Sequence, residues 1–287
     1  MRLEVSPGGT LQGEAVVPGD KSISHRALIL GAIAKGRTVI HNFLDAEDCL
    51  NTYEVLKALG VCLKRDGDTV WIEGVGLRGF QKPKNPLYFG NSGTGIRLMS
   101  GVLVGQSFTT ELIGDGSLSQ RPMKRIVEPL RKMGAMLRGR CIQEEIYLPL
   151  IIEGGVPLEG RTWDLKVPSA QVKSCLLLAG LYAKTPVCVQ AFGVTRDHTE
   201  RMLHRFGAHI KVQDRKIELK PTELNGQWID IPNDFSSAAF FIVGALITPG
   251  AQLVIRKVGL NPTRCGLLEV LKQMGAELRI VNLSRIM

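Results

Sequence analysis

The stretch LKALG at residues 56–60 recurs as LRKMG at 130–134, LHRFG at 203–207 and LKQMG at 271–275. The four glycines that end these stretches are 74, 73 and 68 residues apart. Val or Ala follows each glycine, and the sequence then alternates between apolar and polar residues in the manner of a strand. We interpret each glycine as the residue that ends a helix, just before a strand begins.

A second phrase recurs in step with the first. Short polar stretches open apolar runs with helical spacing, and the markers of these four starts are Ser22, Ser92, Ser169 and Ser236. Their gaps of 70, 77 and 67 residues predict repeated units that each combine two helices with strands. Common solenoid repeats are shorter, at about 20–50 residues. The expected fold class is therefore α/β (α+β), built from repeats of about 70 residues rather than from a solenoid.

The first polar start places cations and hydroxyls where a helix begins. Asp20 and Ser22 are good N-cap residues, and the free N–H groups of a first helical turn favour anions. Lys21 and Arg26 would add positive charge at that point, which predicts an anion site. An ordinary capped helix with solvated charges is the alternative. A P-loop is excluded, because its spacing G-x-x-x-x-G-K-[ST] does not occur around Lys21.

Composition limits the remaining possibilities. The 287 residues are 44% apolar and 22% charged, which is typical of a soluble globular protein with about two domains. A net charge of +9 favours anionic partners, but the basic residues are spread along the chain and only 6% are aromatic, so we expect no nucleic acid partner. No unbroken apolar run is long enough for a membrane span. Six scattered cysteines favour a cytoplasmic protein with reduced thiols.

Six segments carry a resemblance to a known family. They are PGDKSISHRA (18–27), FGNSGTGIRL (89–98), GDGSLSQRPM (114–123), PSAQVKSCLLLAGL (168–181), TRDHTERML (195–203) and NPTRCG (261–266). In order and spacing they resemble 5-enolpyruvylshikimate-3-phosphate synthase, also called 3-phosphoshikimate 1-carboxyvinyltransferase. The resemblance implies an inside-out barrel of β-α-β-α-β-β repeats. It implies two small-molecule substrates, shikimate 3-phosphate and phosphoenolpyruvate, inhibition by glyphosate, and no cofactor or metal.

The resemblance also implies roles for particular residues. Lys21 would contact both substrates and assist proton transfer. The substrate-binding residues would be Lys21, Ser22, Arg26, Asn91, Gly93, Thr94, Arg121, Ser169, Ala170, Gln171 and Arg196. Ser22 and Arg26 would hold the carboxylate side of shikimate 3-phosphate, whereas Asn91 and Arg121 would face phosphoenolpyruvate. His25 and His198 lie inside the motifs without a direct chemical role.

The family has six repeats and four occur here, so we expect one complete three-repeat domain at residues 18–227. Residues 1–17 and 228–287 would form part of a second domain that lacks two repeats. Two function classes stay open. One is an enolpyruvyl transferase, either as a fragment of a longer product or completed by another, C-terminal polypeptide; the other is a non-catalytic remnant that binds shikimate 3-phosphate. The stretch DFSSAAFFIVGALITPG (234–250) predicts a helix with apolar residues nearly all round, which normally means burial on several sides.

Overall fold

The structure is a computed structural model that describes residue 4 and residues 8–281. The chain forms two compact units, which are considered separately. The larger unit comprises residues 21–230, and the smaller unit comprises the described residues up to Asp20 and from Ile231 onward. Each division falls three residues later than the domain boundary expected from the sequence.

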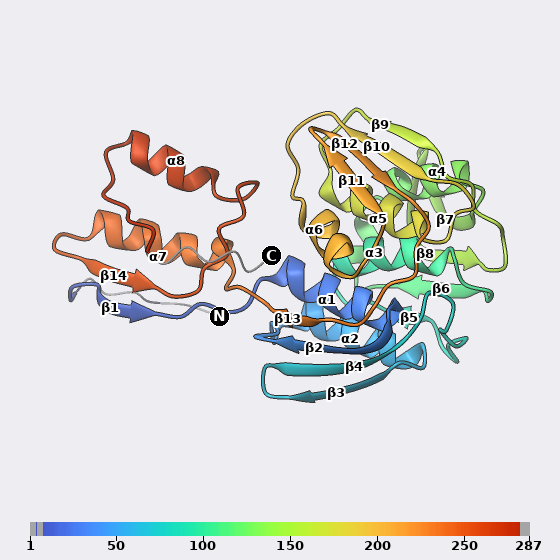
Figure 1. The fold of residues 1–287 in the computed structure, drawn as a ribbon, viewed down its shortest axis with the longest axis horizontal. Coiled ribbons are helices and arrows are strands. Elements are labelled where there is room, and N and C mark those ends of the chain that lie inside the picture. Colours follow the sequence, from blue (N-terminus) through green and yellow to red (C-terminus); the bar gives the residue numbers. More distant parts are fainter. Residues whose placement is uncertain (1–3, 5–7, 282–287) are drawn as a thin grey trace. The chain divides into compact units, whose positions relative to one another are not determined.

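The first repeat of the larger unit takes one strand from far along the chain. Its helices are α1 (Lys21–Ile33) and α2 (Glu47–Ala58), and its sheet has the order β13-β2-β4-β3. These strands are β2 (Lys35–His41), β3 (Cys62–Asp66), β4 (Thr69–Val75) and β13 (Trp228–Asp230). Strand β13 pairs in parallel with β2, whereas β4 is antiparallel to both β2 and β3. Figure 1 shows β13, in orange, beside the blue strand β2.

The next two repeats have the same topology within continuous sequence. The second contains β5 (Leu87–Tyr88), α3 (Gly93–Leu103), β6 (Thr110–Ile113), α4 (Lys124–Lys132), β7 (Met136–Ile142) and β8 (Glu145–Glu153). The third contains β9 (Thr162–Leu165), α5 (Ala170–Gly180), β10 (Val187–Ala191), α6 (His198–Arg205), β11 (Ile210–Gln213) and β12 (Lys216–Leu219). Their sheets have the orders β5-β6-β8-β7 and β9-β10-β12-β11, so the expected β-α-β-α-β-β repeat is present.

The recurring glycines end four helices in the same way. Gly60, Gly134, Gly207 and Gly275 have φ values of 85°, 102°, 89° and 89°, a region that favours glycine. After α2, the Gly60 N–H donates to the Lys57 carbonyl at 2.9 Å and the Val61 N–H donates to the Leu56 carbonyl at 3.1 Å. This is the Schellman pattern, in which the first Leu of the phrase and the residue after glycine also face each other. The prediction that each of these glycines ends a helix is therefore confirmed.

The four marker serines do not share one position. Ser92 and Ser169 are the N-caps of α3 and α5, and each hydroxyl accepts a hydrogen bond from the backbone N–H three residues later. Helix α1 begins at Lys21, so of the two N-cap candidates Asp20 directly precedes the helix, whereas Ser22 lies inside its first turn. Ser236 lies inside the first turn of helix α7 (Phe235–Ile247), whose N-cap is Asp234. The repeat thus preserves a polar first turn rather than one capping residue.

Helices α1, α3 and α5 form the interior of the larger unit. Nine of the eleven residues of α3 and nine of the eleven residues of α5 are buried. A side chain at Gly101 would place its Cβ 2.3 Å from the carbonyl oxygen of Cys175, so this glycine permits the close packing of α3 on α5. The buried helices and outer sheets match the expected inside-out arrangement, and the described strands form separate sheets rather than one closed barrel.

The smaller unit contains part of a fourth repeat. Strand β1 (Gln12–Ala15) pairs in parallel with β14 (Gln252–Ile255), and the helices are α7 and α8 (Gly266–Gln273). A strand was expected after Gly275, in the run AELRIVN. Residues 276–281 form no strand, so that expectation is wrong for them, and residue 282 lies outside the described residues. Within residues 4 and 8–281, no helix is long and apolar enough to cross a membrane.

Candidate active site

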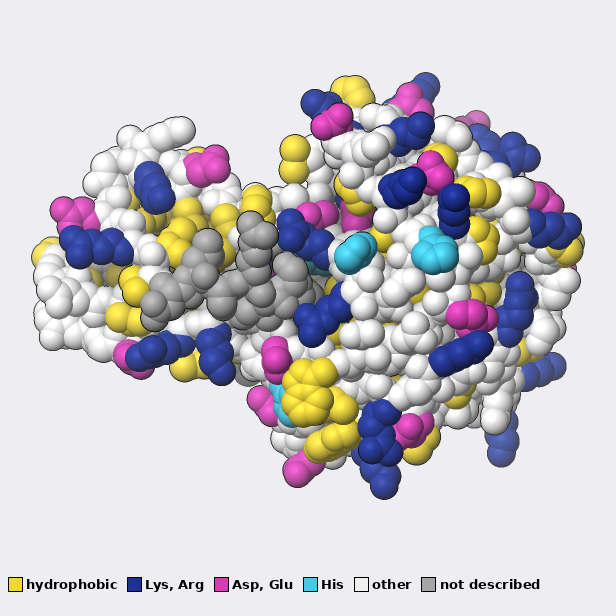
Figure 2. Space-filling view, viewed as in Figure 1, with side chains coloured by type: hydrophobic (Ala, Val, Ile, Leu, Met, Phe, Trp, Pro, Cys, Tyr) yellow, Lys and Arg dark blue, Asp and Glu magenta, His cyan; other side chains and the backbone are white. Residues whose placement is uncertain are grey.

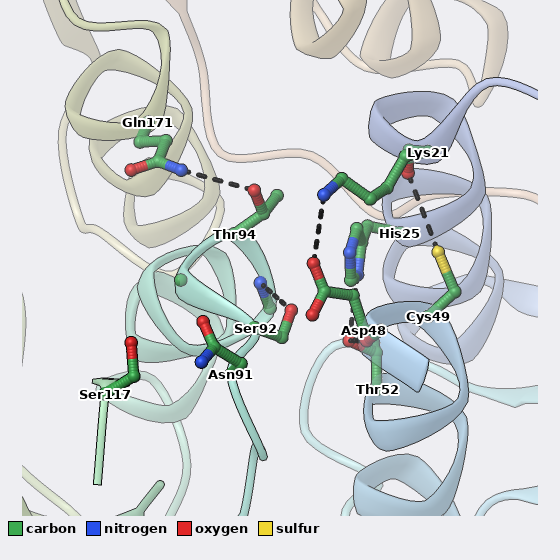
Figure 3. Close-up of polar contacts among 12 residues, drawn as sticks. Lys21, His25, Asp48, Cys49, Thr52, Asn91, Ser92, Thr94, Ser117 and Gln171 are labelled. Carbon is green, nitrogen blue, oxygen red and sulfur yellow. Dashed lines mark hydrogen bonds and ion pairs between the residues drawn. The ribbon is translucent and has the colours of Figure 1, made fainter. Parts of the chain in front are cut away.

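The first turn of α1 holds Lys21 beside α2. Lys21 Nζ lies 3.0 Å from Asp48 Oδ2, and the two side chains are 49% and 27% exposed. Asp48 belongs to the first turn of α2, where the helix dipole favours a carboxylate. An ion pair this exposed adds little stability, so its main effect is to place the Lys21 ammonium (Figure 3).

His25 lies one turn further along α1 and is fully buried. Its Nδ1 lies 2.9 Å from Thr52 Oγ1 on α2. Burial lowers the pKa of His25 to about 3; the Asp48 charge opposes this shift, while Arg26 and Lys21 add to it. The imidazole is therefore neutral near pH 7 and joins α1 to α2 instead of exchanging protons.

The turn before α3 joins Asn91 to Arg121. Arg121 Nη2 donates to Asn91 Oδ1, and Asn91 Nδ2 donates to Asp115 Oδ2 at 2.8 Å. The Leu118 backbone N–H also donates to Asp115 Oδ1 at 2.7 Å. This backbone bond, followed by the Asn91 amide, holds the pKa of Asp115 below its usual value. An ionised Asp115 thus orients Asn91, which in turn positions the Arg121 guanidinium.

Gln171 connects the beginning of α5 to the beginning of α3. Its Nε2 donates to Thr94 Oγ1 at 3.2 Å, and its Oε1 accepts a hydrogen bond from Arg97 Nη1 at 3.3 Å. Arg97 also donates to the Gly93 carbonyl at 3.1 Å. Two helix N-termini, whose first N–H groups have no partner within the helix itself, are therefore held together by one amide.

Gly93 is the first residue of α3 and leaves room for two guanidinium groups. A Cβ at this position would lie 2.8 Å from Arg97 Nη1 and 3.2 Å from Arg121 Nη1. Burial lowers the pKa of Arg97, and the charges of Arg125 and Arg121 lower it further. An arginine nevertheless stays protonated in a protein, so these cations accumulate positive charge at the N-terminus of α3.

The other expected site residues lie at helix starts or in loops. Ser22 is the second residue of α1, and its carbonyl accepts a hydrogen bond from Arg26 Nη1 at 2.8 Å. Ser169 and Ala170 begin α5, where both are half-buried. Arg196 is exposed in the segment between β10 and α6. The structure thus joins Asn91 to Arg121 and Thr94 to Gln171 by direct contacts, whereas Arg196 stays an expectation.

Arg97 and Asp48 are among the site residues that the sequence reasoning missed. Arg97 follows Gly93 by four residues, so its position one helical turn later was a usable signal. Asp48 gave no signal, because its contact with Lys21 joins residues 27 positions apart in different helices. Among the described residues there is no group of three or more His, Cys, Asp or Glu side chains that could hold a metal ion.

Fold and site together define a class of protein: a repeated α/β protein in which cationic side chains gather at the N-termini of its buried helices. Residues 5–286 match the EPSP synthase (3-phosphoshikimate 1-carboxyvinyltransferase) family, and the chain belongs to this family. The resemblance inferred from the motifs is confirmed.

Individual relatives agree with this assignment. The 3-phosphoshikimate 1-carboxyvinyltransferase of Ruthia magnifica is 52% identical over 98% of this chain, and that of Oceanobacillus iheyensis is 50% identical over 96%. The solved EPSP synthase of Acinetobacter baumannii superimposes with a TM-score of 0.90 at 48% identity over 96% of this chain. The chain spans only 64%, 63% and 62% of the lengths of these three proteins.

Proposed function

We propose that the larger unit binds shikimate 3-phosphate and that the chain serves a 3-phosphoshikimate 1-carboxyvinyltransferase reaction. The observation that carries this proposal is the cation cluster at the N-terminus of α3, joined to the start of α5 by Gln171. Helix N-termini and arginines bind phosphates and carboxylates, which both substrates carry. Family membership supplies the identity of the two anions.

The chemistry of the reaction suits such a site. The 5-hydroxyl of shikimate 3-phosphate attacks C2 of phosphoenolpyruvate and gives up its proton while C3 takes a proton. Elimination of phosphate from C2 together with a proton from C3 then restores the double bond. Positioning and electrostatic stabilisation carry most of such a reaction. In this proposal Lys21 contacts both substrates and assists proton transfer, with Asp48 holding its ammonium in place. Gln171 would lie between the substrates, and Arg121 would pair with phosphoenolpyruvate.

A second candidate function is binding of shikimate 3-phosphate without turnover by this chain alone. The chain covers less than two thirds of the relatives' length, so their activity is not carried over by the match alone. A further polypeptide would then complete the enzyme. The cytoplasmic location expected from the scattered cysteines, all six of which are free, also stays a proposal.

Calorimetry of the 287-residue chain with shikimate 3-phosphate tests the binding proposal. We expect measurable binding, and at least about tenfold weaker binding by Lys21→Met, because the substitution keeps the stem but removes the charge. Lys184→Met is the matched control, since Lys184 is 62% exposed and pairs with Glu159 at 3.3 Å, away from these contacts. Failure of the unmodified chain to bind would overturn the proposal. Phosphate release after addition of phosphoenolpyruvate then separates the enzyme from the binding-only candidate.

A further inference from the structure

Arg26 is anchored by two hydroxyl groups that come from two other helices. Its Nε donates to Thr199 Oγ1 on α6 at 2.6 Å, and its Nη2 donates to Ser174 Oγ on α5 at 3.0 Å. The two hydroxyl oxygens lie 2.6 Å apart, so they also hydrogen-bond to each other. All three residues are buried, with Arg26 4%, Thr199 1% and Ser174 0% exposed.

These contacts fix the orientation of the guanidinium plane. Nε–H and one Nη2–H point in the same direction from one edge of an arginine, and the two hydroxyls receive that edge together. Nη1 is held separately by the Ser22 carbonyl. Rotation of the group would break several hydrogen bonds at once inside the protein, where an unsatisfied donor is costly.

The chemical nature of the anchor matters as much as its geometry. Arginine commonly binds a carboxylate through two parallel hydrogen bonds, and such a partner would cancel its charge. Ser174 and Thr199 offer the same two-point grip with oxygens that carry no net charge. They orient the Arg26 guanidinium without themselves neutralising it, which suits a cation that is to attract an anion.

A buried ion pair keeps the two hydroxyls in register. Lys173 precedes Ser174 on α5, Glu200 follows Thr199 on α6, and Lys173 Nζ forms an ion pair with Glu200 Oε1. These two side chains are 3% and 5% exposed. The pair joins α5 to α6 one residue away from the hydroxyl contact, and its two charges cancel.

We propose that Ser174 and Thr199 are positioning residues that hold the Arg26 guanidinium in the orientation in which it meets the carboxylate of the substrate. This inference rests on the proposed function, since the carboxylate is that of shikimate 3-phosphate. It adds to that function a pair of residues that act through Arg26 rather than on the substrate.

The test compares two ligands on the full chain by calorimetry: shikimate 3-phosphate and its methyl ester, in which the carboxylate charge is removed. Thr199→Val removes the hydroxyl at nearly constant volume, and Thr199→Ser keeps it. We expect Thr199→Val to weaken binding of the acid about tenfold and to change binding of the ester less than about twofold. Thr199→Ser should bind both ligands like the unmodified chain, and Ser174→Ala should repeat the Thr199→Val pattern.

Equal losses for acid and ester would show a general structural effect and overturn the inference, as would unchanged binding of the acid. If the unmodified chain binds neither ligand, the proposed function fails instead. The hydroxyl anchor is then tested separately by the exchange of the Arg26 Nε–H with water, measured by NMR. Thr199→Val should speed this exchange at least about tenfold, and Thr199→Ser should not. Equal exchange rates in all variants would contradict the anchor itself.

Discussion

Helices α5 and α7 are both mostly apolar, but their surroundings are very different. Both begin with a capping side chain, Ser169 in α5 and Asp234 in α7, and both continue with mostly apolar residues. In α5 every residue from Val172 to Gly180 is buried. In α7 only Phe235 and Ala238 are buried, and Figure 2 shows hydrophobic side chains gathered on the smaller unit.

The difference shows that an apolar helix sequence predicts a need for partners, not their presence. α5 is surrounded by α3, α4, α6 and β10 of the larger unit, whereas α7 contacts mainly β14. Phe240 and Ile247 on α7 are 80% and 76% exposed. Monomeric proteins rarely expose apolar surface of this kind without a role in association. Substitutions in the two helices can therefore show how much of the stability of an apolar helix comes from packing against its neighbours.

The largest expected effect comes from the ion pair that anchors α5. Glu200→Gln leaves Lys173 as an uncompensated buried charge, so we expect the free energy of unfolding of the larger unit to fall by about 3–5 kcal/mol. All three tryptophans lie within residues 21–230, so tryptophan fluorescence during urea unfolding reports on this unit. Glu128→Gln is the control, because its partner Lys124 is 3.7 Å away and both are partly exposed. A similar loss in the two variants would contradict the prediction.

A second experiment tests the apolar faces directly. Leu177→Ala opens a cavity at a fully buried position of α5. It should lower the free energy of unfolding of the larger unit by about 2–5 kcal/mol, measured by the same fluorescence assay. Phe240→Ala removes a larger side chain from α7, yet it should change the protection of the α7 amides by about 0.5 kcal/mol or less. Hydrogen exchange measures this protection. A large loss of protection would show that Phe240 packs against a partner in solution.

A third experiment measures a pH dependence of the stability of the larger unit. His25 has a folded pKa of about 3, so between about pH 6.5 and pH 3 the unfolded state binds a proton that the folded state does not. The folded state should lose about 1.4 kcal/mol per pH unit as the pH falls through this window. The charged groups that act on the pKa of His25 are Asp48 on α2, which raises it, and Arg26 and Lys21 on α1, which lower it. In His25→Gln, the free energy of unfolding should change less steeply with pH between pH 6 and pH 4 than in the unmodified chain. Equal slopes in the two proteins would show that another group causes the pH dependence.

The repeated fold could be predicted because each repeat carries its own local chemistry. The Leu at C3 and the glycine at C′ of each Schellman motif are fixed by backbone conformation, so they recur regardless of tertiary context. The missing strand after Gly275 shows the limit of this reasoning. An alternating sequence becomes a strand only where another strand pairs with it, and residues 276–281 have no such pairing.

The candidate site could be predicted only where its residues lie at helix starts. Lys21, Asn91, Thr94 and Gln171 occupy polar stretches that the repeat itself marks. Asp48, Ser174 and Thr199 act across helices. Ser174 and Thr199 lie inside two of the six motifs, but their spacing gives no sign that the two hydroxyls meet. Contacts between distant segments are set by packing, which the spacing of residues within one helix does not reveal.

Strand β13 gives the larger unit a particular order of assembly during synthesis. The second and third sheets contain only strands that follow one another in the sequence, so each can form soon after its own residues leave the ribosome. The first sheet pairs Val39 with Trp228 and must wait until the chain has been made beyond Asp230. Closing so long a loop is slow. The N-terminal repeat is therefore translated first and completed last, and its unpaired β2 edge is exposed to chaperones in the meantime.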